Sequence, residues 1–290
     1  MPDSYHIPVL VADVLAGLTV VAGGLYVVAT VGGGGHARHI MAQGGRVIGI
    51  DQDEEALQAA RLTLGPEVQL LHANFRDIQK SLAEVGIEQV DGILADLGVS
   101  SHQLDDLTRG FSFKSDILDM RMDPQRTAVT GADLVATLAE ADLAQIFYDL
   151  GEERYGRKFA AAIVAARTRA PLQARALAEV IWHASPPTYR YGTIHPATRV
   201  FQALRLAVNS ELPTLQDFMP QAANLLGVKG RLVVISFHSL EDRIVKHFIH
   251  DSEALEAVTR KPVMATKEEI SLNPRARSAK LRVAQKRDPQ

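Results

Sequence analysis

The first hundred residues alternate between continuous apolar runs and amphipathic stretches. Four runs are rich in β-branched residues and lack the period-two alternation of a strand with one wet face: Leu25–Val31, Arg46–Asp51, Val68–Asn74 and Val90–Leu97. The segment 53–64, between the second and third runs, has the spacing of a helix with one apolar face. Buried strands separated by helices predict a parallel sheet that is covered on both faces.

The strand rhythm stops after the fourth run and resumes only at Gly230–Phe237. The interval between them holds helical patterns, at residues 131–150, 156–170, 176–184 and 196–212. We therefore expect a mostly helical insertion between the fourth and fifth strands. Beyond the fifth strand, the pattern predicts a helix at Glu241–His250 and two weaker strands, Leu255–Lys261 and Ala279–Gln285, that close the sheet as a hairpin.

Composition places the chain among globular proteins. It has 290 residues, of which 47% are hydrophobic and 22% charged, and no apolar run approaches the length of a membrane span. The first ten residues lack the basic and apolar regions of a signal peptide, so we expect a cytoplasmic protein with no membrane partner. The absence of cysteine excludes disulfides, Cys-ligated zinc and a thiol nucleophile.

Charge is distributed unevenly along the chain, although the net charge is only -3. One basic cluster comprises Arg154, Arg157 and Lys158, and a second lies in the tail, where no acid interrupts Arg275, Arg277, Lys280, Arg282, Lys286 and Arg287. A solvated face would explain either cluster alone. Two of them in one chain favour a surface that faces phosphates.

A glycine loop and an acid occupy the ends of the first two predicted strands. Gly32–Gly35 follows the first, and Asp51 ends the second. Ligands of a doubly wound sheet bind at the carboxyl ends of its strands, where a carboxylate can accept from both hydroxyls of a ribose. A tight turn would also explain the glycines, but with Asp51 the pattern indicates an adenosine-containing ligand. The sequence GGHAR lacks the Lys-Ser/Thr of a P-loop, and a G-x-G-x-x-G pattern is met only loosely, whereas S-adenosylmethionine suits a sheet with a closing hairpin.

Longer motifs specify a family. Besides HIPVL (His6–Leu10), GGGGHA (Gly32–Ala37) and the tail 273–282, the chain contains four long ordered stretches, at Asp91–Phe113, Leu118–Asp123, His195–Leu212 and Ile235–Lys246. From about His6 to about Lys286, the sequence closely resembles the MraW-like family, the bacterial ribosomal RNA small subunit methyltransferases H.

The resemblance implies an α/β fold: a class I (Rossmann-like) S-adenosylmethionine-dependent methyltransferase sheet with a helical domain inserted between strands 4 and 5. The methyltransferase domain would comprise residues 1–103 and 209–290, and the inserted domain residues 104–208. The implied reaction transfers a methyl group from S-adenosyl-L-methionine to the exocyclic N4 of a cytidine, C1402, in 16S rRNA near the decoding centre. The implied partner is this rRNA within a small ribosomal subunit or a late assembly particle.

The family's cofactor contacts fall on seven positions of this chain: Gly34, Gly35, His36, Asp51, Phe75, Asp96 and Gln103. Glycines let a backbone approach the methionine end of the cofactor. An aromatic ring past the third strand can pack on adenine, and a carboxamide can both donate and accept. Asp96 ends the fourth strand beside the expected methyl position, and we assign it as the catalytic residue that accepts from the target amine, with a general-base role left open.

Candidate substrate contacts are more dispersed, at Arg121, His195, Arg199, His238, Arg275 and Arg277. For Arg121 and Arg199, internal salt bridges to nearby acids are an equal alternative. The target base must be unpaired or flipped out of its stack. No metal site is expected, because no His-x-x-x-His pair stands on a helix with a third ligand.

Two departures from the family pattern stand out. Val28 replaces an acid that the family usually carries near the cofactor, and the stretch before Leu118 is one residue shorter. We expect the second to alter only a loop and the first to weaken cofactor binding, unless Val28 simply extends a buried strand. Two alternatives remain. One is a methyltransferase that acts on DNA, protein or a small molecule, and the other is a non-catalytic RNA-binding assembly factor that has lost cofactor affinity through Val28.

Overall fold

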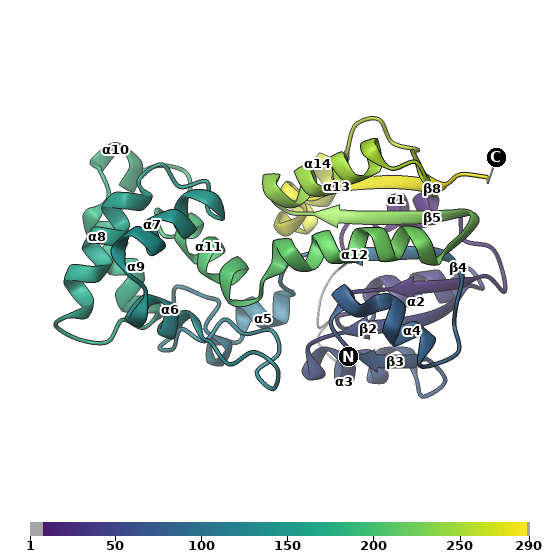
Figure 1. The fold of residues 1–290 in the computed structure, drawn as a ribbon, viewed down its shortest axis with the longest axis horizontal. Coiled ribbons are helices and arrows are strands. Elements are labelled where there is room, and N and C mark those ends of the chain that lie inside the picture. Colours follow the sequence, from purple (N-terminus) through teal and green to yellow (C-terminus); the bar gives the residue numbers. More distant parts are fainter. Residues whose placement is uncertain (1–7, 289–290) are drawn as a thin grey trace. The chain divides into compact units, whose positions relative to one another are not determined.

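The computed structural model describes residues 8–288, so His6 and Ile7 of the HIPVL motif lie outside the described residues. The chain forms two compact units (Figure 1). The sheet unit runs up to Gly98 and resumes at Leu212, and the helical unit comprises Val99–Glu211. Within the part of the chain that the structure describes, no helix is both long enough and apolar enough to cross a membrane.

One sheet organises the sheet unit. Its strands are β1 (Leu25–Val28), β2 (Arg46–Asp51), β3 (Gln69–His72), β4 (Val90–Asp96), β5 (Leu226–Ser236), β6 (Leu255–Ala257), β7 (Val263–Met264) and β8 (Lys280–Lys286). They are ordered β3-β2-β1-β4-β5-β8-β6, with β7 also paired to β8. The first five in this order are parallel, and β8 runs antiparallel to its neighbours. Strand order reverses at β1, so the ligand crevice is expected at the carboxyl ends of β1 and β4.

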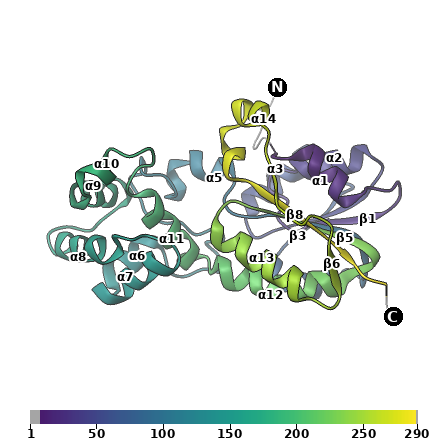
Figure 2. The same ribbon diagram turned by 90° about the horizontal axis from the view of Figure 1, so that it is seen from above.

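Helices cover both faces of this sheet (Figure 2). They are α1 (Val11–Leu18), α2 (Gly35–Ala42), α3 (Glu54–Leu64), α4 (Ile78–Ala83), α12 (Glu211–Leu225) and α13 (Ser239–Asp251). The short helix α14 (Lys267–Leu272) buries none of its residues and projects away from the sheet, and the unit also contains two 3₁₀ turns, η1 (Phe75–Asp77) and η3 (Pro274–Ser278). Val27 packs in the core on the side of α4, α12 and α13, and Val28 in the core on the side of α1, α2 and α3. Successive residues of β1 thus point to opposite layers, and both are apolar because both layers are dry.

The helical unit has its own core. Its elements are α5 (Ser101–Asp105), η2 (Leu107–Arg109), α6 (Gly131–Thr137), α7 (Glu140–Asp149), α8 (Gly156–Arg167), α9 (Ala174–Ala184), α10 (Pro187–Arg190) and α11 (Thr198–Val208). Phe147 and Phe159, both fully buried, lie in a cluster built from α6–α9 and α11. The single helical pattern at 131–150 is two helices, because α6 ends before Leu138, which has an extended backbone.

The predicted α/β class is confirmed, with differences at the strand ends. β1 ends at Val28 rather than Val31, but the Ala29 amide still donates to the Leu94 carbonyl and the Val31 amide to the Ile50 carbonyl. Leu94 belongs to β4 and Ile50 to β2, the two neighbours of β1. The backbone beyond Val28 therefore stays in the plane of the sheet as it enters the glycine loop. The two late runs do pair, but β8 inserts between β5 and β6.

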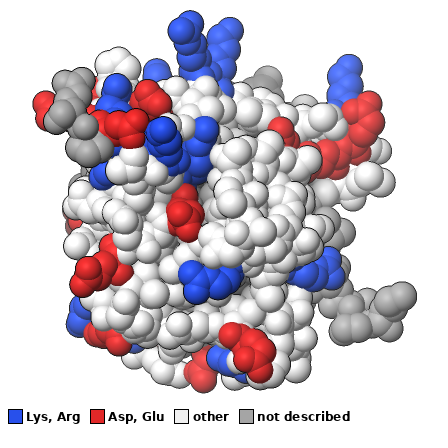
Figure 3. Space-filling model, turned by 90° about the vertical axis from the view of Figure 1, so that its right-hand side faces the viewer, with Lys and Arg blue, Asp and Glu red and all other residues white. Residues whose placement is uncertain are grey.

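Charge on the side of the molecule where β5 begins is mixed. In Figure 3, Lys and Arg are interspersed with Asp and Glu, and wide uncharged areas separate them. Such a face does not present the continuous basic surface that phosphate binding needs. Any phosphate contacts of this chain are therefore expected on other faces.

Candidate active site

The glycine loop joins β1 to α2 in a conformation that requires glycine. Gly32 has φ +51° and Gly34 has φ +88°, a region that side chains with a Cβ rarely adopt. A Cβ on Gly34 would also lie 2.9 Å from Leu64 Cγ, whereas the space beside Gly32 is open. Gly34 is the N-cap of α2, so the loop ends where the helix begins. The backbone near Gly32 is thereby accessible to a ligand that lies over the strand ends.

Asp51 fastens this loop to the end of β2. One carboxylate oxygen accepts from the Gly32 amide (2.8 Å) and the other from the Asp53 amide (2.9 Å). A carboxylate has about four acceptor positions, so capacity remains for two ribose hydroxyls. Burial raises the pKa of Asp51 to about 6, an effect that the two amide donors partly oppose. The residue predicted to bind ribose is thus held in place by the loop predicted to hold the cofactor.

Because of this pKa, we expect cofactor affinity to fall as the pH drops through about 6. Protonation removes acceptor capacity that the ribose hydroxyls need. Calorimetric titrations with S-adenosylmethionine between pH 5 and pH 8 will measure the effect, with Asp51→Asn as the control that should bind weakly and without this pH step. A wild-type affinity that is flat across pH 6 would contradict the assignment.

The same shift predicts the sign of a stability change in the ligand-free protein. The folded-state pKa of about 6 exceeds the ordinary value of 3.8, so the folded state binds the proton more tightly. The contribution of Asp51 to folding stability is therefore greatest at low pH and is lost as the pH rises through about 6.

The turn after Asp51 is tied to the end of β3. His72 Nε2 lies 3.0 Å from the Gln52 carbonyl oxygen, and the Asn74 side-chain amide donates to the Gln52 side-chain oxygen (2.8 Å). Asn74 also caps η1, which carries Phe75. The half-buried Phe75 ring meets the Phe218 ring edge-on, with centroids 5.2 Å apart. Phe75 thus packs against the core of the sheet unit, and its role at the adenine stays a prediction.

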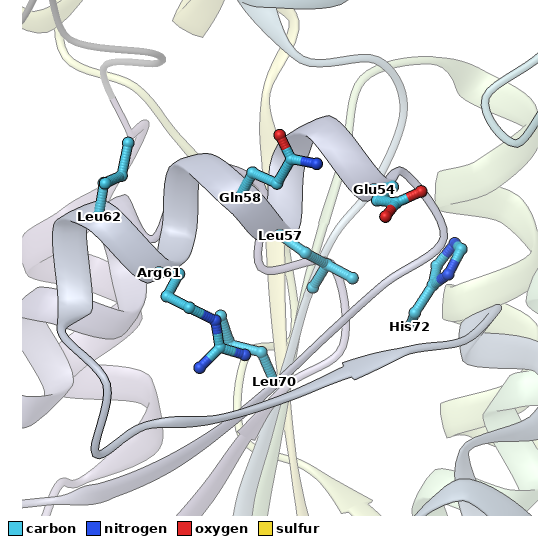
Figure 4. A pocket seen from close by; sticks show the side chains of 7 residues that line it. All are labelled: Glu54, Leu57, Gln58, Arg61, Leu62, Leu70 and His72. Carbon is cyan, nitrogen blue, oxygen red and sulfur yellow. The ribbon is translucent and has the colours of Figure 1, made fainter.

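A surface hollow beside this region is separate from the predicted site. It lies between α3 and β3 (Figure 4), and its lining residues are Glu54, Leu57, Gln58, Arg61, Leu62, Leu70 and His72. None of the predicted catalytic or cofactor-binding residues belongs to this lining. We therefore assign it no part in the reaction.

Asp96 and His36 meet at the carboxyl ends of β4 and β1. Asp96 Oδ2 lies 3.5 Å from His36 Nε2, and both side chains are largely buried. The Asp96 backbone amide donates to Thr30 Oγ1 (2.8 Å), which fixes the end of β4 against the end of β1. Asp96 Oδ1 and both ring nitrogens of His36 are buried without a hydrogen-bond partner among the described residues.

Unsatisfied buried polar atoms are rare in native proteins. In the described part of the sheet unit they are His36 Nδ1, His36 Nε2, Asp96 Oδ1, Thr214 Oγ1 and His238 Nε2. His238 follows β5, the strand next to β4, so four of these five atoms come from residues that follow or end β1, β4 and β5. His238 Nε2 faces a carboxylate of its own helix, whereas the His36 nitrogens and Asp96 Oδ1 lack hydrogen bonds among the described residues, which fits a site that is completed by a polar ligand.

His238 is fixed as the N-cap of α13. Its Nδ1 accepts from the Glu241 amide (3.4 Å), and the Glu241 carboxylate in return accepts from the His238 amide (3.3 Å) and also from the Phe237 amide (2.8 Å). His238 Nε2 also lies 3.2 Å from Glu241 Oε1. The structure thus explains His238 as part of a capping box, and its predicted substrate role stays a prediction.

The remaining candidates lie in the helical unit or on η3. Gln103 completes a capping box of α5 with Ser100 and is buried. Arg121 pairs with Asp119 through two hydrogen bonds of 2.8 and 2.7 Å, and Arg199 donates to the Glu152 carbonyl (2.7 Å). The contact of Arg121 is the internal salt bridge that the sequence left open, whereas the printed contact of Arg199 is to a backbone carbonyl and not to an acid.

His195 is exposed and lies between two other rings. Its ring centroid is 4.9 Å from that of Phe113 and 5.4 Å from that of Trp182. Arg275 and Arg277 both lie on η3, where Arg277 is exposed and Arg275 is half-buried.

Comparison with known proteins identifies the family. The model of the MraW methylase family matches residues 3–287. The chain belongs to the MraW methylase family. The family predicted from the motifs is thus confirmed, and with it an S-adenosylmethionine-dependent methyltransferase.

Curated relatives span almost the same length. A protein from Cyanothece sp. named ribosomal RNA small subunit methyltransferase H is 52% identical, over 99% of this chain and 96% of its own. A protein of the same name from Deinococcus radiodurans is 47% identical, over 98% of this chain and 91% of its own. Among solved structures, a methyltransferase from Streptococcus mutans in complex with SAH is 12% identical with a TM-score of 0.47, covering 97% of this chain and 99% of that one.

Three features of the site were not predicted from the sequence. Thr30, which accepts from the Asp96 amide, precedes the glycine loop but carries no motif signal of its own. The Gln52–Asn74 tie joins two loops that are distant in the sequence. His36 lies near Asp96 because β1 pairs with β4. Neither sequence motif indicates this pairing, so the contact could not be predicted from them.

Proposed function

We propose that the protein transfers a methyl group from S-adenosylmethionine to the exocyclic N4 of a cytidine, C1402, in 16S rRNA. The observation that carries the reaction class is the carboxyl edge of β1, β2 and β4, where the glycine loop, Asp51 and the unpartnered Asp96 Oδ1 lie. The choice of small-subunit rRNA rests on the names of relatives that match almost the whole chain.

The residues present fit this methyl donor. The backbone of the glycine loop, with Gly34 and Gly35, can accommodate its methionine end, Asp51 its ribose and Phe75 its adenine. When bound, S-adenosylmethionine supplies an electrophilic methyl group on a sulfonium. Gln103, in the helical unit, is carried over from the family as a further polar contact.

Asp96 acts on the acceptor. The cytosine amine is a weak nucleophile because its lone pair is delocalised into the ring. A carboxylate oxygen that accepts from one amine hydrogen can hold the nitrogen in line for attack, and such positioning lowers the barrier substantially. Asp96 Oδ1 is suited to this role because it is buried and has no other partner among the described residues.

A row of aromatic rings in the helical unit is suited to unpaired bases. Phe113, His195 and Trp182 follow one another with their rings tilted by 31° and 22°, and Tyr191, which is 76% exposed, meets Trp182 edge-on. The Arg190 guanidinium lies 5.9 Å from the centroid of Trp182. Exposed aromatic rings beside arginine are typical of surfaces that bind single-stranded nucleic acid. This arrangement supports RNA over a small molecule as the substrate.

Phosphate contacts by η3 can be measured through salt. If Arg275 and Arg277 each neutralise one phosphate, the double variant Arg275→Ala, Arg277→Ala should flatten the plot of log affinity against log salt by roughly 1.4. The control pair Lys80→Ala, Lys246→Ala, exposed on α4 and α13, should leave the slope unchanged. An unchanged slope in the arginine variant would mean that these side chains are structural or solvated.

One assay separates the proposal from its alternatives. Labelled S-adenosylmethionine is offered with small-subunit particles, naked 16S rRNA and DNA, and the product is digested to nucleosides. We expect N4-methylcytidine from the RNA of the particles. Label in DNA or in neither nucleic acid would favour another methyltransferase substrate. RNA binding without cofactor binding would favour an assembly factor.

A further inference from the structure

His36 presents a buried imidazole that lacks the partners such a group normally has. The side chain is only 7% exposed, and neither ring nitrogen makes a hydrogen bond within residues 8–288. Buried polar side chains are hydrogen-bonded in the large majority of cases. An imidazole in this state is therefore a candidate for a role beyond the fold.

The nearest charged group faces only one of its nitrogens. His36 Nε2 lies 3.5 Å from Asp96 Oδ2, slightly beyond hydrogen-bond length, while Asp96 Oδ1 has no partner. The Asp96 backbone is held by Thr30, so the end of β4 is fixed while the carboxylate is not. The two oxygens of Asp96 are thus already distinguished, with Oδ2 toward His36 and Oδ1 without a hydrogen-bond partner in the described part of the chain.

We propose that His36 is a positioning residue for Asp96, in addition to its backbone contribution to the glycine loop. The neutral imidazole donates from Nε2 to Asp96 Oδ2 and fixes the carboxylate plane, so that Oδ1 accepts from the target amine. As the amine nitrogen bonds to the methyl carbon, the carbon–sulfur bond breaks with its electrons going to sulfur, and the amine proton passes to Asp96 Oδ1. His36 itself neither gains nor loses a proton. This inference rests on the proposed function.

The ligand-free protein offers a test that does not depend on turnover. Nitrogen-15 NMR of the His36 ring should show the tautomer protonated at Nε2, and Asp96→Asn should shift the Nε2 resonance. His39, one turn along α2 and half-buried, is the matched control whose ring signals should not respond to Asp96→Asn. A His36 ring protonated at Nδ1, or one that does not respond to Asp96→Asn, would overturn the proposal.

Stability gives a second readout without cofactor. His36→Leu exchanges the single proposed bond to Asp96 Oδ2 for apolar packing in a site that is only 7% exposed, so the melting temperature of the ligand-free protein should change by no more than roughly 4 °C in either direction. A residue that served mainly the fold would lower the melting temperature by more than this on removal. His36→Gln keeps a donor in a side chain of similar reach and supplies the measurements if the leucine variant does not fold.

Steady-state kinetics, measured over a range of cofactor concentrations up to saturation, complete the test. We expect His36→Leu to lower kcat about 10- to 100-fold, the usual scale for groups that orient a reacting residue, with little change in the KM for S-adenosylmethionine. His36→Gln should recover most of this loss, and His39→Leu should keep wild-type kcat. In an Asp96→Asn background, the additional loss from His36→Leu should be below about threefold, because the effect acts through Asp96.

Two results would contradict the positioning role of His36, and a third would instead contradict the proposed methylation of rRNA. Equal losses from His36→Leu with and without Asp96 would mean that the residues act independently. A changed KM with unchanged kcat would make His36 a cofactor contact only. If the wild-type protein itself methylates no RNA, the proposed function fails, whereas the NMR and stability results still report on the His36–Asp96 pair.

Discussion

Replacing Asp96 with alanine is expected to lower methyl transfer by a factor of about 100 or more, the typical scale for loss of a positioned catalytic group. The fold should tolerate the change, because Asp96 Oδ1 makes no hydrogen bond to the described residues, Oδ2 approaches only to 3.5 Å of His36 Nε2, and the bond from the backbone amide to Thr30 remains. We therefore expect the melting temperature to stay within a few degrees of wild type. Single-turnover transfer to small-subunit particles, with thermal unfolding measured on the same preparations, will check both parts.

Asp96→Asn refines this experiment. It keeps the shape of the side chain and one acceptor oxygen but removes the charge and the capacity to take a proton. An asparagine variant as slow as alanine would assign the effect to charge or proton transfer, and one close to wild type would assign it to orientation alone. Turnover near normal in Asp96→Ala would rule out a catalytic role.

Val28→Asp is expected to destabilise the protein strongly without improving cofactor binding. The side chain of Val28 is 1% exposed and packs in the core cluster that includes Val9, Leu94 and Ile235. An aspartate there would be a buried charge without a partner, which costs about 3–5 kcal/mol, or a melting temperature lower by roughly 10 °C. This environment favours the interpretation that Val28 extends a buried strand over the one in which it weakens the hold on the cofactor.

Calorimetric titration of S-adenosylmethionine into Val28→Asp and the wild-type protein decides between the two. Val28→Thr, of nearly the same shape and without charge, separates polarity from charge. Binding that tightens roughly tenfold in the aspartate variant would show that an acid here reaches the methionine ammonium, since a charge-assisted hydrogen bond is worth about 1.5–3 kcal/mol.

The fold was predictable from the sequence where local pattern and final environment agree. The runs that became β1–β4 are apolar on both faces because helices cover both faces, and this is visible in composition alone. α12 was not predicted, because it contains Pro220 and lies next to a domain boundary. β7, only two residues long, exists through its pairing with β8 and has no independent signal.

The site was predictable in its residues but not in its contacts. Motif positions identified Asp51 and Asp96, since acids at the ends of buried strands need a reason to be there. The bond from the Gly32 amide to Asp51 and the approach of His36 to Asp96 depend on strand register, which a single sequence does not specify. The internal pairing of Arg121 with Asp119 is local, two residues apart, and was accordingly anticipated as one of two alternatives.

The position of β8 constrains how the chain acquires its structure during synthesis. β4 and β5 are neighbours in the sheet, but the whole helical unit separates them along the sequence. β8, the last strand, must then enter between β5 and β6. Residues 99–211 are contiguous and have their own core, so they can collapse as soon as they emerge from the ribosome. The sheet unit closes only through pairings distant in sequence, which form slowly. We therefore expect the nascent chain to carry a folded middle and a sheet that is completed by β5 and β8 only when translation is nearly finished.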